Sequence, residues 1–265
     1  MSKQKPPKPF YIGWQDEMPP EHRNTLRKFI IPIFIALPIL AFAIIYAQKG
    51  FNDHQFEFGN LTKLTGVYHS KPVPVLEVTG GGLDADLSND VLLVGYGKFG
   101  AEGILAQIEQ SKGSLDGKTI SLQGTLIHGD GQTLMELTEE EKSLVDVGDI
   151  APLIAVPSEK TLPVTLTGTI LDPKCYFGVM KPGEGKIHKS CAIRCISGGI
   201  PPVFRMTSDK GENEYYVLLG AQGETINMEV LDKIAEPVRI TGTTNSTSGW
   251  NYLYAKVEDI ELIEK

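Results

Sequence analysis

The chain has few cysteines and no excess of positive charge. Only 3 of its 265 residues are cysteine, which is too few, and an odd number, for the disulfide framework of a small secreted scaffold. Its 25 Lys and Arg against 33 Asp and Glu give a formal net charge of -8, which argues against nucleic-acid binding driven by overall charge. With 41% hydrophobic and 22% charged residues, the composition instead predicts one or two folded domains.

Long apolar runs are absent apart from one. Residues 29–47, FIIPIFIALPILAFAIIYA, carry no charge and are long enough, at about 1.5 Å of rise per residue, to cross a hydrocarbon layer of about 30 Å. We predict an N-terminal transmembrane helix over 29–47, preceded by a leader over residues 1–28. The small residues Ala41 and Ala43 around Phe42 leave a cleaved signal peptide open as an alternative.

The charges that flank this run predict its orientation. Arg23, Arg27 and Lys28 precede it, whereas only Lys49 follows it closely. Because cytoplasmic segments carry the excess of basic residues, the leader is predicted to be cytoplasmic. The leader has a net charge of +3, so the rest of the chain carries -11. We therefore expect an inner (cytoplasmic) membrane protein with one span, whose C-terminal domains are periplasmic.

The part after the run reads as mainly β and contains an internal repeat. Short β-branched segments end in Gly, Asn, Asp or Pro, as strands do. Shifted by 118 positions, the strand-turn-strand pattern around Gly124 matches that around Gly242. Each half also has a helix-compatible stretch after its third strand, residues 101–110 and 225–235.

This order of elements is that of the OB-fold, a five-stranded Greek-key barrel with one helix between its third and fourth strands. We predict a mainly β protein with two OB-like modules, residues 58–138 and 160–265. Residues 139–159, which contain prolines and a run of glutamates, are predicted to form the linker between them.

All three cysteines fall close together and share their segment with a histidine. Cys175, His188, Cys191 and Cys195 follow the pattern C-x12-H-x2-C-x3-C, in the connection between the first two strands of the second module, a usual ligand-binding loop of OB barrels. On a helix, positions 188, 191 and 195 lie within an arc of about 60°, so one face would present all three side chains. Thiolates and imidazole predict a Zn or Cu site.

Two other uses of the cysteines remain open. Outside the cytoplasm, Cys175 could form a disulfide with Cys191 or Cys195 and leave one free thiol. Alternatively, two of the three could form a redox-active thiol pair, because nearby lysines and an arginine favour the thiolate.

The segment over residues 166–202 resembles a segment of uncharacterised bacterial membrane-anchored or exported proteins with an OB-like fold. The resemblance is carried by Gly168, Asp172, Cys175 and the HKSCAIRC block over residues 188–195. The resemblance implies an OB-like fold and export from the cytoplasm, and it implies no activity for this chain.

The first module also contains an enzyme-like pattern. Residues 95–100, GYGKFG, satisfy G-x-G-x-x-G between an apolar strand and a helix, as a dinucleotide-binding fingerprint requires. The acidic residue expected about 20 positions later is missing, since that strand ends at Gln123 and Gly124. A tight connection between strand and helix is the alternative use of these glycines.

Taken together, these patterns predict a non-catalytic accessory or assembly subunit of a membrane redox system of respiratory type. It would bind a metal or cofactor, or dock an integral membrane or periplasmic redox complex, and we assign no catalytic residue. The first alternative is a thiol redox or copper-transfer protein that uses the three cysteines, and the second is a dinucleotide-dependent oxidoreductase. We expect no nucleic-acid partner, because OB-folds bind oligonucleotides through basic, aromatic faces.

Overall fold

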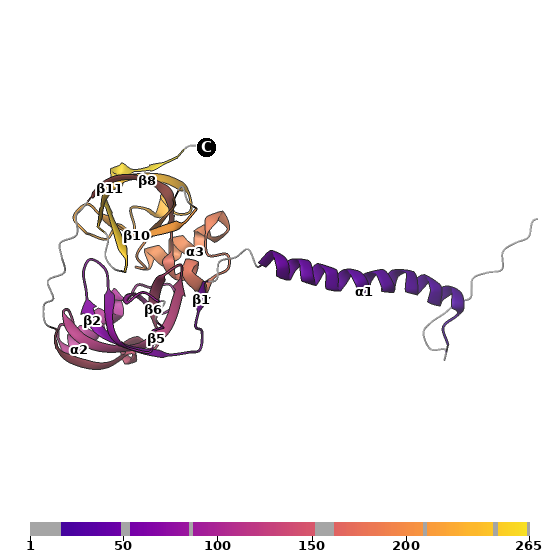
Figure 1. The fold of residues 1–265 in the computed structure, drawn as a ribbon, viewed down its shortest axis with the longest axis horizontal. Coiled ribbons are helices and arrows are strands. Elements are labelled where there is room, and N and C mark those ends of the chain that lie inside the picture. The colour runs from indigo at the N-terminus through magenta and orange to yellow at the C-terminus, as the bar shows by residue number, and fades with distance from the viewer. Residues whose placement is uncertain are drawn as a thin grey trace, which may run out of the picture. The chain divides into compact units, whose positions relative to one another are not determined.

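The computed structural model describes residues 17–48, 54–84, 87–151, 162–208, 211–245 and 249–263. The chain divides into two compact units, Met1–Asn52 and Asp53–Lys265. It is mainly β, with 40% strand against 31% helix, and much of the helix lies in the first unit (Figure 1). The sequence-based prediction of the fold class is therefore confirmed.

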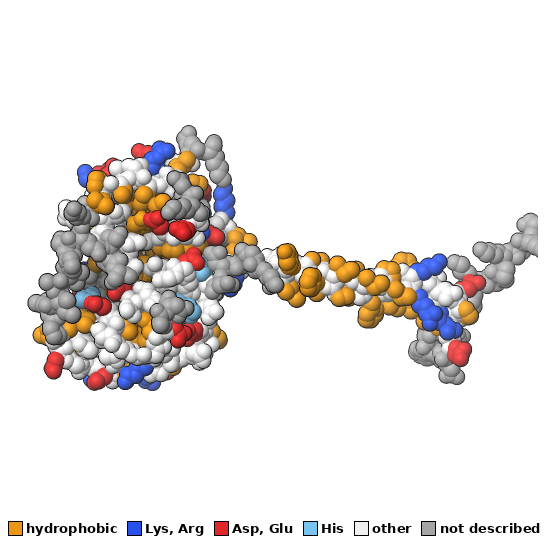
Figure 2. Space-filling model, viewed as in Figure 1, with side chains coloured by type: hydrophobic (Ala, Val, Ile, Leu, Met, Phe, Trp, Pro, Cys, Tyr) orange, Lys and Arg blue, Asp and Glu red, His pale blue; other side chains and the backbone are white. Residues whose placement is uncertain are grey.

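The first unit contains one long helix, α1 (Pro20–Gln48). Its apolar stretch has a mean hydropathy of 2.7 and none of it is buried. Figure 2 shows apolar side chains along α1, with lysine and arginine gathered at its N-terminal end. By length and composition α1 can cross a membrane. The first sixteen residues of the predicted leader lie outside the described part of the chain.

The second unit begins with a closed five-stranded barrel. Its strands follow the order β5-β2-β3-β4-β6, and β6 pairs back onto β5; β4 and β6 are parallel and the other pairs antiparallel. The helix α2 (Glu102–Lys112) connects β4 to β5, as in an OB-fold. The strands are β2 (Thr62–His69), β3 (Val75–Gly81), β4 (Asp90–Gly95), β5 (Lys118–Gly129) and β6 (Gln132–Leu137).

A second barrel repeats this topology. Its strands follow the order β11-β8-β9-β10-β12, and β12 pairs back onto β11; β10 and β12 are parallel. Two closed barrels with the same strand order confirm the two OB-like modules. The strands are β8 (Leu162–Leu171), β9 (Val203–Thr207), β10 (Asn213–Gly220), β11 (Pro237–Asn245) and β12 (Asn251–Ala255).

Three short strands extend the barrels. β1 (Gln55–Phe56) and β7 (Leu144–Ile150) pair with β5, and β13 (Ile260–Leu262) pairs with β11. The first part of the predicted linker, 139–151, is thus a 3-10 helix, η1 (Glu140–Ser143), followed by a strand of the first sheet. The remainder of that linker, 152–159, lies outside the described residues.

The internal repeat has a packing cause. Gly124 on β5 and Gly242 on β11 occupy equivalent places, and a side chain at either would collide with a backbone oxygen of the neighbouring strand, that of Glu136 or of Tyr254. Thr125 pairs with Glu136, as Thr243 pairs with Tyr254. The tight closure of each barrel therefore requires glycine at this point.

The second helix-compatible stretch does not form a helix. Residues 225–235 make turns and one short 3-10 helix, η3 (Leu231–Lys233). The Asn227 side chain donates hydrogen bonds to the carbonyl oxygens of Ile196 at 2.8 Å and Ile200 at 2.9 Å. These bonds hold the stretch against residues 196–200, so tertiary contacts override its helical propensity.

Three apolar clusters form the core. One lies within each barrel, and a third joins the two. The third includes an aromatic group in which Phe177 contacts Tyr215 and Trp250 at ring-centroid distances of 4.9 and 5.9 Å. Cys175 and Cys195 belong to this third cluster. The cysteines therefore lie where the modules meet.

Candidate metal centre

Two short elements of the second module carry the cysteines and the histidine. Between β8 and β9 the chain forms a wide turn, η2 (Cys175–Val179), and then α3 (Gly185–Ser197). Asp172 Oδ1 accepts hydrogen bonds from the backbone N–H groups of Lys174 at 3.0 Å and Cys175 at 3.4 Å. These bonds fix the start of the turn, and with it the direction of the first cysteine.

The helix α3 lies between two apolar clusters. Ala192 and Ile196, four residues apart, pack into the core of the second barrel, whereas Cys195 packs into the cluster between the modules and Cys191 lies against it. The helix ends where Gly199 adopts a φ of 102°, a conformation that favours glycine. The face that bears the cysteines is thereby directed at the first module.

The ligand atoms of these side chains come within metal-binding distance. The Sγ atoms of Cys175 and Cys191 and a ring nitrogen of His188 lie within 4.8 Å of one another. A second group, also within 4.8 Å, comprises Cys175, Cys195 and a carboxylate oxygen of Asp172. The three other residues predicted from the sequence, His188, Cys191 and Cys195, thus each have a ligand atom close to that of Cys175. Asp172, three residues before Cys175, is a further candidate ligand that the sequence analysis did not assign.

Two polar atoms of the site have no hydrogen-bond partner. His188 Nε2 and Asp172 Oδ2 are both buried, and neither makes a hydrogen bond of acceptable geometry within the described ranges. An unpaired buried polar atom costs roughly 1–3 kcal/mol. Each atom belongs to a residue of one of the two groups, where a bound cation would satisfy it, and sulfur, imidazole nitrogen and carboxylate oxygen are all ligands of zinc.

A lysine of the first module reaches into the same site. Lys98 Nζ lies 2.8 Å from Cys191 Sγ and 3.9 Å from Cys195 Sγ. The hydrogen bond with Cys191 is the main cause that raises the pKa of Lys98. The sequence analysis missed this residue because it placed Lys98 in the possible dinucleotide fingerprint. A single lysine in a glycine-rich stretch, between Gly97 and Phe99, gave no signal of its partner.

Burial and charge set the protonation of two ligands. Burial lowers the pKa of His188, and Lys98 acts in the same direction while Asp172 opposes it, so the imidazole is neutral and able to bind a metal at neutral pH. The pKa of Cys175 is raised, first by the hydrogen bond it shares with Cys195, then by burial and by Asp172. Cys175 therefore stays a thiol until a cation compensates its charge.

The loop that carries Lys98 is fixed by a buried ion pair between the modules. Lys174 Nζ lies 2.6 Å from Glu136 Oε1, and the two side chains are only 3% and 6% exposed. The same ammonium donates to the carbonyl oxygens of Gly95 and Gly97, each at 2.8 Å. Glu136 Oε1 also accepts from the backbone N–H of Gly97 at 3.1 Å. Both modules thus hold the loop in place.

These bonds bear on the dinucleotide hypothesis. The N–H of Gly97 is bound to Glu136, and that of Gly100 donates to the carbonyl of Gly198 at 3.0 Å. A phosphate-binding loop needs such N–H groups directed at its ligand. In this chain the loop uses them to join the modules, so the structure does not favour a bound dinucleotide.

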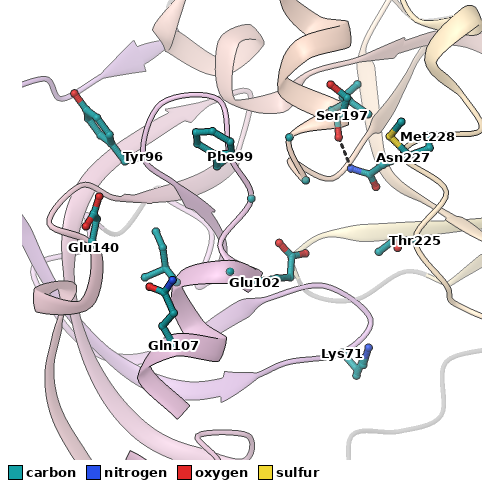
Figure 3. A pocket seen from close by; sticks show the side chains of 16 residues that line it. Lys71, Tyr96, Phe99, Glu102, Gln107, Glu140, Ser197, Thr225, Asn227 and Met228 are labelled. Carbon is teal, nitrogen blue, oxygen red and sulfur yellow. Dashed lines mark hydrogen bonds between the residues drawn. The ribbon is translucent and has the colours of Figure 1, made fainter. Parts of the chain in front are cut away.

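A groove of about 770 Å³ runs along the other side of the same loop (Figure 3). Tyr96 and Phe99 of the loop and Met228 of the second module are 57%, 65% and 63% exposed. The carboxylates of Glu102 and Glu140 also line the groove. Desolvation by its surroundings raises the pKa of the Glu102 carboxyl. The residue nevertheless keeps part of its surface exposed to solvent in the groove.

The three cysteines are free in this structure. The disulfide predicted as one alternative is not formed, and the Sγ atoms of Cys175 and Cys195 lie within 4.8 Å of each other, so a movement of the side chains would be needed for them to pair. Both metal binding and thiol oxidation are therefore chemically accessible at this site.

No family model, curated protein or solved structure matches this chain. The resemblance of residues 166–202 to membrane-anchored or exported proteins with an OB-like fold thus stays a prediction, and the function has to be argued from the site itself.

Proposed function

We propose that this chain is a non-catalytic accessory or assembly protein of a membrane redox system, and that it binds a thiophilic metal ion between its two modules. The observation that carries the proposal is the gathering of three thiols, one imidazole and one carboxylate around Cys175. The unpaired buried atoms, His188 Nε2 and Asp172 Oδ2, support it, because a folded site without a cation leaves both unsatisfied.

The donor set favours zinc over copper. Cu(I) takes soft sulfur ligands, and three thiols with an imidazole would suit it. A carboxylate such as that of Asp172 is a hard ligand, and Zn²⁺ accepts sulfur, nitrogen and oxygen alike. Cys191 is half-buried whereas Cys175 and Cys195 are buried, so an ion would enter or leave beside Cys191.

The proposal places the metal site in modules that α1 anchors to a membrane. The helix α1 is long and apolar enough to anchor the chain. With Arg23, Arg27 and Lys28 near its N-terminal end, the modules would face the periplasm from the inner membrane. An anchored protein meets partners that are themselves in or near the same membrane.

The groove beside the site suits an apolar segment of such a partner. Exposed Tyr96, Phe99 and Met228 offer apolar contacts, and aromatic side chains often anchor interfaces. Glu102 and Glu140 on the groove wall require that this segment carry lysine or arginine. An integral membrane or periplasmic subunit of the redox complex is the partner we propose.

Metal analysis of the full chain, purified in detergent under reducing conditions, tests the metal site. We expect zinc at about one equivalent or more, with slow reaction of the three thiols until a chelator is added. His188→Ala should lower the zinc content and expose the thiols. His69→Ala is the matched control, because His69 is an exposed histidine on the first barrel. A chain without metal, with all three thiols reactive, would refute the proposal.

A thiol-exchange protein is the second candidate, and the contact between Lys98 and Cys191 favours it. An ammonium 2.8 Å from a sulfur stabilises the thiolate, which is the nucleophile in disulfide exchange. The Cys191 thiolate would attack a partner disulfide and release one partner thiolate. Cys175, whose Sγ lies within 4.8 Å of that of Cys191, would then attack the Cys191 sulfur and displace the second partner thiolate, which leaves the partner reduced and a disulfide between Cys175 and Cys191. Reduction of a model disulfide by the metal-free chain, slowed by Lys98→Met, would distinguish this activity.

A further inference from the structure

We propose that the site holds two zinc ions that share the Cys175 thiolate. One ion is bound by His188 and Cys191, and the other by Cys195 and Asp172, with Cys175 between them; each ion has three side-chain ligands and takes water as its fourth. This inference rests on the metal site proposed above and deepens it, because it assigns the number of ions and the ligands of each.

The first argument is the number of donors. Zinc in protein sites is almost always four-coordinate, yet five side chains present a ligand atom here: three sulfurs, one nitrogen and one oxygen. They form two groups of three, and only Cys175 belongs to both. A thiolate sulfur has several lone pairs and can bind two cations at once. A single tetrahedral ion would leave at least one buried donor unused.

The second argument is the position of the unpaired atoms. His188, whose Nε2 is unpaired, belongs to one group, and Asp172, whose Oδ2 is unpaired, belongs to the other. An ion in the first group alone leaves the Asp172 oxygen unsatisfied, and an ion in the second alone leaves the histidine nitrogen unsatisfied. Two ions satisfy both.

The third argument is the charge. Three thiolates and one carboxylate carry four negative charges, and one Zn²⁺ compensates half of them. Lys98 adds one positive charge beside Cys191, but the Lys174 ammonium is already bound to Glu136. Two Zn²⁺ ions match the four negative charges; with Lys98 the site then carries +1, against the -1 that a single ion leaves, so the charge of this buried site permits the second ion.

Cadmium substitution tests this arrangement on the full chain in detergent. Cd²⁺ replaces Zn²⁺ at thiolate sites, and ¹¹³Cd NMR reports each bound ion separately. We expect two ions per chain by elemental analysis and two resonances, split by a coupling through the shared sulfur. Asp172→Asn should leave one ion and one resonance, because the amide keeps the Oδ1 acceptor for the turn and loses the charge. His188→Ala should remove the other resonance, and His69→Ala should retain both.

The outcomes separate the two proposals. One cadmium per chain with a single resonance would overturn the shared-thiolate site and leave the metal-binding function standing. No bound cadmium in the folded, reduced chain would overturn both. Two resonances without coupling, or two ions retained in Asp172→Asn, would also refute the assignment of ligands. The wild-type result decides alone if a variant fails to fold.

Discussion

The buried ion pair between Glu136 and Lys174 predicts a large loss of stability when only one partner is changed. The two charged atoms are 2.6 Å apart and almost inaccessible to water. Glu136→Gln keeps an oxygen that can accept the N–H of Gly97 but removes the negative charge. The ammonium is then left buried with neutral acceptors alone, the amide oxygen and the two carbonyl oxygens of the loop. Breaking a buried pair in this way costs about 3–5 kcal/mol, so we expect the free energy of unfolding to fall by that amount.

Urea unfolding of the detergent-solubilised chain measures this loss, followed by the fluorescence of Trp250 in the core between the modules. The matched control is Glu236→Gln, which breaks a pair with Lys189 of similar length, 2.7 Å, whose side chains are 26% and 29% exposed. Solvent screening limits that loss to about 0–1 kcal/mol. Equal losses in the two variants, or a loss below about 1 kcal/mol for Glu136→Gln, would refute the reasoning from burial.

Three further predictions concern Gly198, Lys98 and Asp116. Gly198→Ala should destabilise the chain by about 1–3 kcal/mol in urea unfolding, because its side chain would collide with the Lys98 carbonyl; Gly103→Ala, with open space around it, should be neutral or stabilising. In the metal-free chain, Lys98→Met should slow alkylation of Cys191 by iodoacetamide, measured by peptide mass spectrometry, and an unchanged rate would exclude a thiolate held by the lysine. A backbone N–H lowers the pKa of Asp116, so its contribution to stability is present above about pH 4 and is lost as the pH falls through the lowered pKa. Asp116→Asn should accordingly make the acid limb of the unfolding profile less steep.

The barrels were predictable because their constraints are local and occur twice. The glycines at positions 124 and 242 stand where strands close the barrel, so the same packing demand left the same pattern in both halves. The Cys/His cluster was predictable for a similar reason, since its four members lie within twenty-one residues and three of them, His188, Cys191 and Cys195, are at helical spacing. Both are patterns that a single stretch of sequence carries by itself.

The other parts of the site could not be predicted, because they depend on contacts between distant segments. Lys98 and Cys191 are 93 positions apart, and nothing near either residue identifies the other. The stretch 225–235 has helical spacing, but side-chain bonds from Asn227 to another segment determine its backbone. The GYGKFG pattern was ambiguous in the same way, since its glycines are used for packing between modules rather than for a phosphate.

The contact between Lys98 of the first module and Cys191 of the second has a consequence for the evolution of the chain. Two barrels with one topology and matching glycines are the arrangement that duplication of a gene would produce. In such a chain, contact between a lysine of one copy and a cysteine of the other would restrict substitution at both positions. In related chains, replacement of the residue at 98 should therefore accompany replacement at 191, and a second module transplanted without its own first module should have an incomplete site.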